Sequence, residues 1–357
     1  MYRLTKAIPN EGGPSRIPEV SFHPTGSMFA VTFQQNNEVR LFDAQSRSLT
    51  RVYKNPDAGL DGPHGLLVTD NHIIVGNVHK MDKPSQLAVY EINAPSTGPV
   101  SIYETPFKHL REAHSLAIHD DTLVVSYCEK EDKTGAIVSY RFDDATGKIT
   151  DVIDKQESCF KGYGDAKGVT FNADGTKVLV SFNSEKKKTT REKRSINYSH
   201  AKKAWNSGGV SDLAKEVLRK ISRKVIQQRH YPVLENGIMI FSINKNGEFS
   251  RHPVKLILRK EFCRLENINC VDNICVVTDL VNQRVYLYDI SVDESLEEPI
   301  QIIHVKNALP HGAKISPDKK TIVLANFGLE KTEDTIHWNL WRTPREDKIA
   351  IYDLLET

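Results

Sequence analysis

Six polar residues recur at matching places of a repeated phrase, and their types are those of metal ligands and acid–base groups. They are Glu19, His64, His114, Lys167, Glu266 and His311. Imidazoles and carboxylates bind zinc, iron and manganese, and they also transfer protons. The sequence therefore predicts that these six residues are catalytic, with His64, His114, His311 and Glu19 binding one divalent metal ion of unassigned identity. The alternative is a polar ring that only hydrates a channel, in which Lys167 and Glu266 form an ion pair.

The repeated phrase consists of two short apolar runs around a turn, and it occurs six times. Its clearest copy runs from Leu309 to Phe327, with Pro317 and Asp318 in the turn, where proline fixes φ and aspartate bonds its own backbone. The other copies open at Ile17, Gly62, Glu112, Asp165 and Arg264. Each copy continues into a third and usually a fourth apolar run. Four short strands per repeat are typical of a β-propeller blade, and most gaps are too short for the helices of a parallel α/β fold.

The sixth repeat stops after its third strand, and the other end of the chain supplies a replacement. Residues 3–8 resemble the fourth strand of the first repeat and precede that repeat at the right distance. Pairing the two ends in one blade is expected to close the ring and leave no unpaired sheet edge. The sequence thus predicts an all-β protein, a single closed six-bladed propeller domain over residues 1–357.

Two insertions interrupt the repeats, both between the second and third strands of a blade. Residues 184–236 interrupt blade four and residues 328–346 interrupt blade six. The first insertion is basic, with 14 Lys or Arg against four acidic residues in 185–230. It is also predicted to be partly helical, because Ser211 can cap a helix and Leu213, Val217, Ile221 and Val225 form one apolar stripe.

The basic charge of the first insertion predicts a binding site for nucleic acid or another polyanion. The predicted contacts are Lys186, Lys187, Lys188, Arg191, Lys193 and Arg194. An amphipathic basic helix could instead lie on an anionic membrane. The third possibility is a helix that docks on the propeller by its apolar stripe and leaves its charged face in water.

Strand direction places both insertions, the six-residue ring and the ends of the second strands on one face of the propeller. Insertions that crowd one face usually mark the binding face. The predicted substrate contacts are Asn77, Tyr127, Asp279, Asn326, His337, Trp338, Trp341 and Arg342. The two tryptophans could alternatively pack to anchor their loop.

Composition limits the remaining possibilities. No apolar run reaches 18 residues, so no transmembrane segment is expected, and the first residues lack the apolar core of a secretory signal. The five cysteines include no C-x-x-C pair, which favours a reducing, cytoplasmic location over a disulfide framework. The sequence contains no G-x-S-x-G, H-E-x-x-H, Walker or dinucleotide-binding motif.

One family resemblance follows from the repeat itself. Pro310-His311-Gly312, Ser316-Pro317-Asp318 and Val323-Leu324-Ala325-Asn326 resemble the repeat of lactonase-like, YVTN-type β-propellers, and Pro63-His64-Gly65 and Asn172-Ala173-Asp174-Gly175 are weaker copies. That superfamily includes sugar-lactone hydrolases, lyases with metal-assisted channels and non-enzymatic scaffolds. The chain departs from it in having six blades, where many members have seven, and in the basic insertion. The resemblance carries over no catalytic residue.

Two functional hypotheses remain. The first is a hydrolase or lyase of the lactonase-like type that acts on a small anionic substrate, for example a sugar derivative, at the mouth that bears the insertions. The second is a non-catalytic scaffold that binds a protein or polyanion through the same face and its basic arm. In the absence of metal, Glu19 is expected to raise the pKa of His64 or His311, because a carboxylate stabilises a nearby imidazolium.

Overall fold

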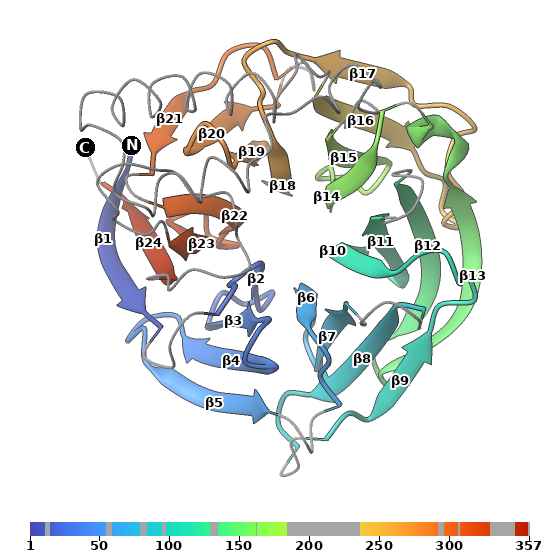
Figure 1. The fold of residues 1–357 in the computed structure, drawn as a ribbon, viewed down its shortest axis with the longest axis horizontal. Helices are drawn as coiled ribbons and strands as arrows, with labels where there is room; N and C mark the ends of the chain where they lie inside the picture. The colour runs from blue at the N-terminus through green and yellow to red at the C-terminus, as the bar shows by residue number, and fades with distance from the viewer. Residues whose placement is uncertain are drawn as a thin grey trace, which may run out of the picture.

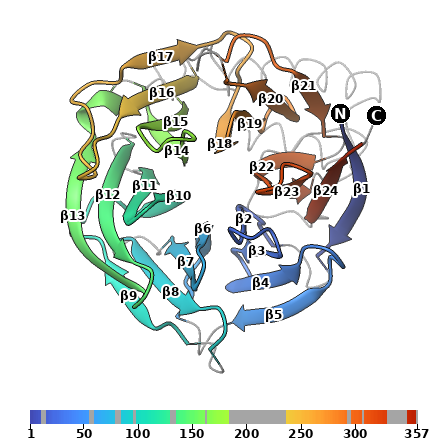
Figure 2. The same ribbon diagram turned by 180° about the vertical axis from the view of Figure 1, so that it is seen from behind.

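The computed structural model describes residues 1–10, 15–54, 59–78, 84–94, 98–128, 135–161, 163–183, 236–291, 296–305, 308–328 and 347–355. These residues form six four-stranded antiparallel sheets, arranged around a central axis like the blades of a propeller (Figure 1, and from behind in Figure 2). Apart from a short 3₁₀ helix at Ser158–Phe160, the regular structure of the described residues is strand. The all-β, six-bladed prediction is therefore confirmed.

The first three blades follow the chain from the inside outwards. Blade one contains β2 (Val20–Phe22), β3 (Met28–Phe33), β4 (Glu38–Asp43) and β5 (Leu49–Lys54). Blade two contains β6 (Pro63–Val68), β7 (His72–Asn77), β8 (Gln86–Glu91) and β9 (Ser101–Glu104). Blade three contains β10 (Glu112–His119), β11 (Thr122–Cys128), β12 (Ala136–Asp143) and β13 (Lys148–Gln156).

The remaining blades repeat this order, except that the last blade combines both ends of the chain. Blade four contains β14 (Asp165–Phe171), β15 (Lys177–Asn183), β16 (Gly237–Ser242) and β17 (Lys255–Leu258). Blade five contains β18 (Leu265–Val271), β19 (Ile274–Asp279), β20 (Arg284–Asp289) and β21 (Gln301–His304). Blade six contains β22 (Ala308–Ile315), β23 (Thr321–Gly328), β24 (Lys348–Leu354) and β1 (Tyr2–Pro9).

The pairing of β1 with β24 closes the propeller. The two strands are antiparallel, from Tyr2 opposite Leu354 to Pro9 opposite Lys348, with one irregularity between Leu4 and Lys6. Both chain ends accordingly lie beside the same blade (Figure 1). The predicted outer strand at residues 3–8 is confirmed. Because β1 takes the fourth position, the third strand of blade six is paired on both sides, as the third strands of the other five blades are.

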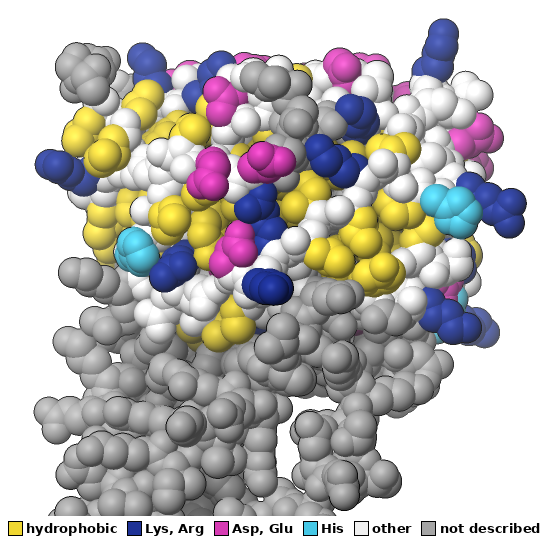
Figure 3. All heavy atoms as spheres, turned by 90° about the horizontal axis from the view of Figure 1, so that it is seen from above, with side chains coloured by type: hydrophobic (Ala, Val, Ile, Leu, Met, Phe, Trp, Pro, Cys, Tyr) yellow, Lys and Arg dark blue, Asp and Glu magenta, His cyan; other side chains and the backbone are white. Residues whose placement is uncertain are grey.

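The hydrophobic core lies between neighbouring blades. Middle strands such as β7 and β11 are buried along their whole length, because each of their faces packs against another sheet. The outermost strands are half exposed: in β17 and β21 the side chains of Leu256, Leu258 and Ile302 reach solvent. Figure 3 looks onto this rim, where hydrophobic side chains lie among Lys, Arg, Asp and Glu.

A bulge interrupts the innermost strand of five blades at the predicted ring residue. The register shifts at Ala113/Ser115, Ala166/Val169, Leu265/Asn267, Pro310/Gly312 and Pro63/Leu66. A bulge leaves one residue without a partner and turns its side chain out of the regular alternation. The repeated bulge therefore turns a ring of side chains toward the axis.

The predicted insertions correspond to the stretches between β15, which ends at Asn183, and β16, which begins at Gly237, and between β23, which ends at Gly328, and β24, which begins at Lys348. Residues 184–235 and 329–346, which include the helix predicted in the first insertion, lie outside the described part of the chain, so both insertions stay predictions. Within the part that the structure describes, no helix is long and apolar enough to cross a membrane.

Candidate active site in the central ring

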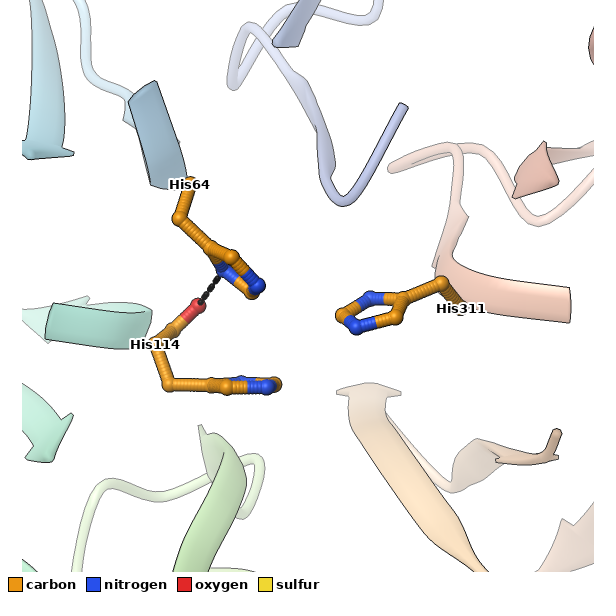
Figure 4. Close-up of side chains that lie close together, drawn as sticks. All are labelled: His64, His114 and His311. Atoms are coloured by element: carbon orange, nitrogen blue, oxygen red, sulfur yellow. Dashed lines mark hydrogen bonds between the residues drawn. The ribbon is translucent and has the colours of Figure 1, made fainter. Parts of the chain in front are cut away.

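Three histidines from separate blades converge on the central axis. His64, His114 and His311 are located on β6, β10 and β22, and their rings point toward one another (Figure 4). The ring centroids of His64 and His114 are 4.3 Å apart, and that of His311 is 5.1 and 5.3 Å from these two. One ligand nitrogen of each histidine lies within 4.8 Å of the others. Small closing movements would bring them onto one metal ion, since Zn–N bonds are about 2.0–2.1 Å long.

Backbone carbonyls fix two of the three imidazoles in one tautomer. The Nδ1 of His64 lies 3.1 Å from the His114 carbonyl oxygen (Figure 4), and the Nδ1 of His311 lies 2.8 Å from the Pro18 carbonyl oxygen. A carbonyl oxygen can only accept, so Nδ1 carries the hydrogen and Nε2 keeps its lone pair. Metal-binding histidines commonly have this arrangement. The buried Nδ1 of His114, by contrast, has no hydrogen-bond partner among the described residues.

Glu266 lies at the centre of the ring. Its Oε2 is 3.3 Å from the Nε2 of His114 and 3.5 Å from the Nε2 of His311, and its Oε1 accepts a bond from the Arg264 guanidinium. Burial would raise the pKa of this carboxyl, but Arg264 and Lys167 outweigh it and hold the pKa well below its usual range. Glu266 is therefore a permanent anion in contact with two of the three imidazoles.

Lys167 is a buried cation beside Glu266. Its Nζ lies 3.9 Å from the Glu266 carboxylate, 3.7 Å from that of Asp165 and 3.3 Å from the Cys128 sulfur. Burial would lower the pKa of Lys167, but Cys128 and the carboxylates of Glu266 and Asp165 raise it above its usual value, so the ammonium stays charged. The ion pair expected between Lys167 and Glu266 is confirmed.

Glu19 lies outside the group formed by the three histidine nitrogens. Its Oε2 accepts a bond of 2.7 Å from the Asn267 amide, and its Oε1 accepts one of 3.1 Å from the Val20 backbone. These donors hold the carboxylate, and Gly312 leaves it room, since a Cβ there would lie 2.7 Å from the Glu19 Oε1. Burial raises the pKa of Glu19 to about 7.

The expectation that Glu19 raises a histidine pKa is wrong. Burial lowers the pKa of His64 and of His311, the latter to about 3, and holds that of His114 well below its usual value. The physical reason is that all three rings are almost inaccessible to water, and desolvation penalises the imidazolium more than the nearby carboxylates stabilise it. The three imidazoles are thus neutral at neutral pH, as metal binding requires.

A second possible ligand group shares His114 and was missed by sequence reasoning. Glu112, His114 and Cys128 also bring one ligand atom each within 4.8 Å of one another. Glu112 and Cys128 are direct partners in the pairing of β10 with β11. Only the strand register, which the sequence pattern gives to within a few residues, could have revealed this pair.

The four predicted substrate contacts that the structure describes are all buried at the ends of second strands. Asn77 bonds the backbone of Gly59 and Asp61, and Asp279 accepts bonds from the backbone of Cys263 and Arg264. These two residues therefore fasten the chain segments that enter the first strands. Their assignment to substrate binding stays a prediction.

The other two described contacts, Tyr127 and Asn326, differ in their hydrogen-bond partners. The Tyr127 hydroxyl is hydrogen-bonded to that of Tyr140 in the core between blades. Both side-chain amide atoms of Asn326 are buried and lack a partner within the described ranges, and the assignment of Asn326 to substrate binding stays a prediction. The remaining predicted contacts lie outside the described residues: His337, Trp338, Trp341, Arg342, Lys186, Lys187, Lys188, Arg191, Lys193 and Arg194.

Comparison with solved structures places the fold among propeller proteins of known structure. The chain is similar to hydrazine synthase of Kuenenia stuttgartiensis, with a TM-score of 0.54 and 13% identity, covering 89% of this chain and 94% of that one. It is also similar to a luciferin-regenerating enzyme, with a TM-score of 0.57 and 9% identity over 98% of this chain and 96% of that one.

A third similar structure is regucalcin from Agrobacterium tumefaciens, described as a calcium-binding protein. The TM-score is 0.55 and the identity 12%, over 97% of this chain and 93% of that one. Comparison with protein-family models and with curated protein sequences gives no match. At these identities the likeness concerns the fold, and the narrower resemblance to YVTN-type repeats stays a prediction.

Proposed function

We propose that the central ring is the active site of a metal-dependent hydrolase or lyase of the lactonase-like type. The observation that carries this proposal is the convergence of His64, His114 and His311, neutral and with two Nε2 lone pairs directed by carbonyl hydrogen bonds. Three imidazoles with a further position left for water or substrate are a common catalytic zinc arrangement. The fold likeness to a luciferin-regenerating enzyme and to a calcium-binding protein is in keeping with an enzymatic role that uses a metal ion.

The charge around the ring also favours a cation. The carboxylates of Glu112, Asp165 and Glu266 face it, against the two cations Lys167 and Arg264. Buried like charges are stable only when a counter-charge is near. A divalent ion held by the three imidazoles would supply that counter-charge.

Each residue then has a role in opening an ester or lactone. A bound divalent ion would polarise the substrate carbonyl or lower the pKa of a water molecule. Lys167, which stays charged, would stabilise an oxyanion or an anionic group of the substrate. Glu266 would hold His114 in place by accepting a hydrogen bond from its Nε2, 3.3 Å away, and Glu19, with a pKa of about 7, would exchange a proton near neutral pH.

Elemental analysis of protein purified without an affinity tag tests the metal site. We expect about one equivalent of a divalent transition metal, lost in His114→Ala and His311→Ala but retained in His252→Ala, which changes an exposed histidine away from the ring. Hydrolysis of a panel of sugar lactones and simple esters should require the metal and stop with a chelator. The proposal fails if the purified protein contains no metal, hydrolyses none of these substrates and does not differ from its histidine variants in either respect. The scaffold hypothesis would then remain.

A further inference from the structure

Each blade has one second-strand position beside the ring residue of its first strand, which is the bulge in blades two to six, and we call it the hydroxyl position. From blade one to blade six it is occupied by Thr32, Gly76, Ser126, Ser181, Thr278 and Ala325. Four of these residues carry a hydroxyl group, and all four of these side chains are buried, with no exposed surface. A buried hydroxyl needs both a donor and an acceptor, so its partners reveal what it holds in place.

Thr278 joins two blades at the ring. Its Oγ1 accepts a bond of 2.9 Å from the backbone N–H of Asn267 in its own blade, directly after the bulge. The same hydroxyl donates a bond of 2.7 Å to the backbone carbonyl of His311 in the next blade. Thr278 therefore fastens the peptide that carries one of the three metal-binding imidazoles.

Thr32 makes the same connection for the second imidazole. Its Oγ1 accepts a bond of 3.1 Å from the backbone N–H of Glu19 and lies 3.1 Å from the His64 carbonyl oxygen. The Glu19 carbonyl oxygen is farther from the hydroxyl, at 3.3 Å, so the shorter of the two bonds goes to His64. Ser126 repeats the pattern between Ser115 and the Lys167 carbonyl.

The two blades without a hydroxyl use their ring histidine instead. Blade two has Gly76, and the Nδ1 of His64 donates to the His114 carbonyl in blade three. Blade six has Ala325, and the Nδ1 of His311 donates to the Pro18 carbonyl in blade one. A Cβ at Gly76 would lie 2.7 Å from the Ala113 carbonyl oxygen, so no hydroxyl side chain fits there. Hydroxyls and imidazoles thus take complementary places around the ring.

We propose that Thr32 and Thr278 are positioning residues that set the tautomer and direction of His64 and His311. Each hydroxyl donates to the backbone carbonyl of a histidine. The Nδ1–H of that histidine in turn donates to a backbone carbonyl of the next blade, which directs Nε2 toward the axis. This inference rests on the proposed metal site. Hydrogen bonds behind metal ligands typically change metal affinity 10–100-fold when they are removed.

The experiment compares Thr278→Val, which keeps the shape and removes the hydroxyl, with Thr278→Ser, which keeps the hydroxyl. Co²⁺ is added to metal-free protein, and its affinity and visible absorption spectrum are measured. We expect Thr278→Val to lower the affinity about 10–100-fold and to change the spectrum, and Thr278→Ser to restore both to within about threefold. Thr32→Val should weaken binding in the same way, which covers the case that Thr278→Val does not fold.

Ser181→Ala is the matched control. Ser181 occupies the hydroxyl position of blade four and accepts a bond of 2.8 Å from the Gly168 backbone, but it donates to no ring carbonyl within the described residues. Because the Ser181→Ala variant also loses a buried hydroxyl, its melting temperature should fall about as far as that of Thr278→Val. Its affinity for Co²⁺ should equal that of the unchanged protein. Equal affinity and spectrum in Thr278→Val and the unchanged protein would overturn the proposal.

A second measurement separates this inference from the metal proposal. Long-range ¹H–¹⁵N NMR spectra of metal-free protein report which nitrogen of each histidine carries the hydrogen. We expect His64 and His311 as single Nδ1–H tautomers, and a mixture for His311 in Thr278→Val. The unchanged protein could bind no Co²⁺ while Thr278→Val still converts the single His311 tautomer into a mixture. In that case the positioning role holds and only the metal proposal fails. A tautomer mixture already present in the unchanged protein would refute the positioning role.

Discussion

At the scale of single residues, burial decides the protonation states of Glu19 and the three histidines, whereas charge pairing decides those of Glu266 and Lys167. Glu19 has its pKa raised to about 7 and His311 has its pKa lowered to about 3, and desolvation is the largest cause of both shifts. Each group is therefore shifted toward its neutral form. The two shifts have opposite effects on stability as the pH falls, so single variants can separate them.

His311→Gln should reduce the loss of stability in acid. Because the pKa of His311 is depressed in the folded state, its contribution is complete above the unfolded value of about 6.5 and is lost as the pH falls toward about 3. Metal-free protein unfolded by urea at several pH values gives the measurement. The stability advantage of the unchanged protein over the variant should shrink by at most about 1.4 kcal/mol per pH unit below 6.5. A pH-independent difference would contradict this prediction.

Glu19→Gln should show the opposite trend. A carboxyl whose pKa is raised to about 7 destabilises the folded state above that pH, and this penalty disappears as the pH falls toward about 4.5. Glutamine keeps an acceptor for the Asn267 amide and cannot ionise. Relative to the unchanged protein, the variant should therefore be most stable at pH 8, by up to about 3 kcal/mol, and lose that advantage by pH 5. Calorimetry at both pH values tests it, and an advantage that grows in acid would contradict it.

The sequence identified the histidines of the site but not their contacts. Aligning the repeats brought out His64, His114 and His311 because each precedes a similar apolar run, and the structure brings them together. It could not show that Glu19 turns toward Asn267, since that depends on the room left by Gly312 in a neighbouring blade. Side-chain direction at a bulge is set by three-dimensional packing, which a repeat alignment does not contain.

At the scale of single elements, β1 and the basic insertion make separate contributions. β1 is largely exposed, and its main contribution is the hydrogen-bonded ladder with β24. Its loss would expose the edge of β24, and exposed strand edges pair with other chains. The insertion interrupts blade four without interrupting the sheet, because β15 and β16 remain paired.

Deletion of residues 1–9 should destabilise the protein and promote its aggregation. At about 1 kcal/mol for each ladder hydrogen bond, the loss is about 3–6 kcal/mol. The melting temperature should fall by roughly 10 °C on a scale of about 2–4 °C per kcal/mol. Leu4→Lys, which changes an exposed side chain and keeps the ladder, serves as the control. A truncated protein that melts like the full chain and stays monomeric would show that β1 does not close the ring.

Replacing Lys186, Lys187, Lys188, Arg191, Lys193 and Arg194 by serine should abolish binding to heparin or nucleic acid. If these residues neutralise phosphates or sulfates, binding of the unchanged protein should weaken steeply between ~50 and ~200 mM salt. Stability should not change. Serine replacements of the exposed Lys148, Lys245 and Lys260 are the control. Equal retention of all three proteins on a heparin column would favour a solvated arm.

At the scale of the whole molecule, the six-bladed ring was predictable because its unit is repeated. Turn residues such as Pro317 and Asp318 mark the hairpins, and runs such as Ile322–Leu324 mark the buried strands, so errors in one copy are corrected by the others. The links between blades were not predictable. Thr278 and His311 belong to different repeats, and no local pattern indicates that one holds the carbonyl of the other.

Added metal should stabilise the whole propeller, because its three predicted ligands come from blades two, three and six. Binding to the folded state alone contributes about 2.7 kcal/mol at a metal concentration 100 times the dissociation constant. The melting temperature of metal-free protein should rise by several degrees with Zn²⁺ or Co²⁺, and the rise should be absent in His114→Ala. An equal rise in the variant would place the bound metal elsewhere.

The closure of blade six also has a consequence for how the protein is made. β1 is synthesised before every other strand of the propeller, whereas β24, its strand partner among the described residues, is the last of them. At roughly 5–20 residues per second, β1 waits on the order of 20–70 s with its ladder groups unpaired. The charged side chains of Arg3 and Lys6 in β1 limit pairing with other nascent chains in that interval. The native propeller is completed only after β24 has been synthesised, so chaperone dependence should concentrate on the first and last strands.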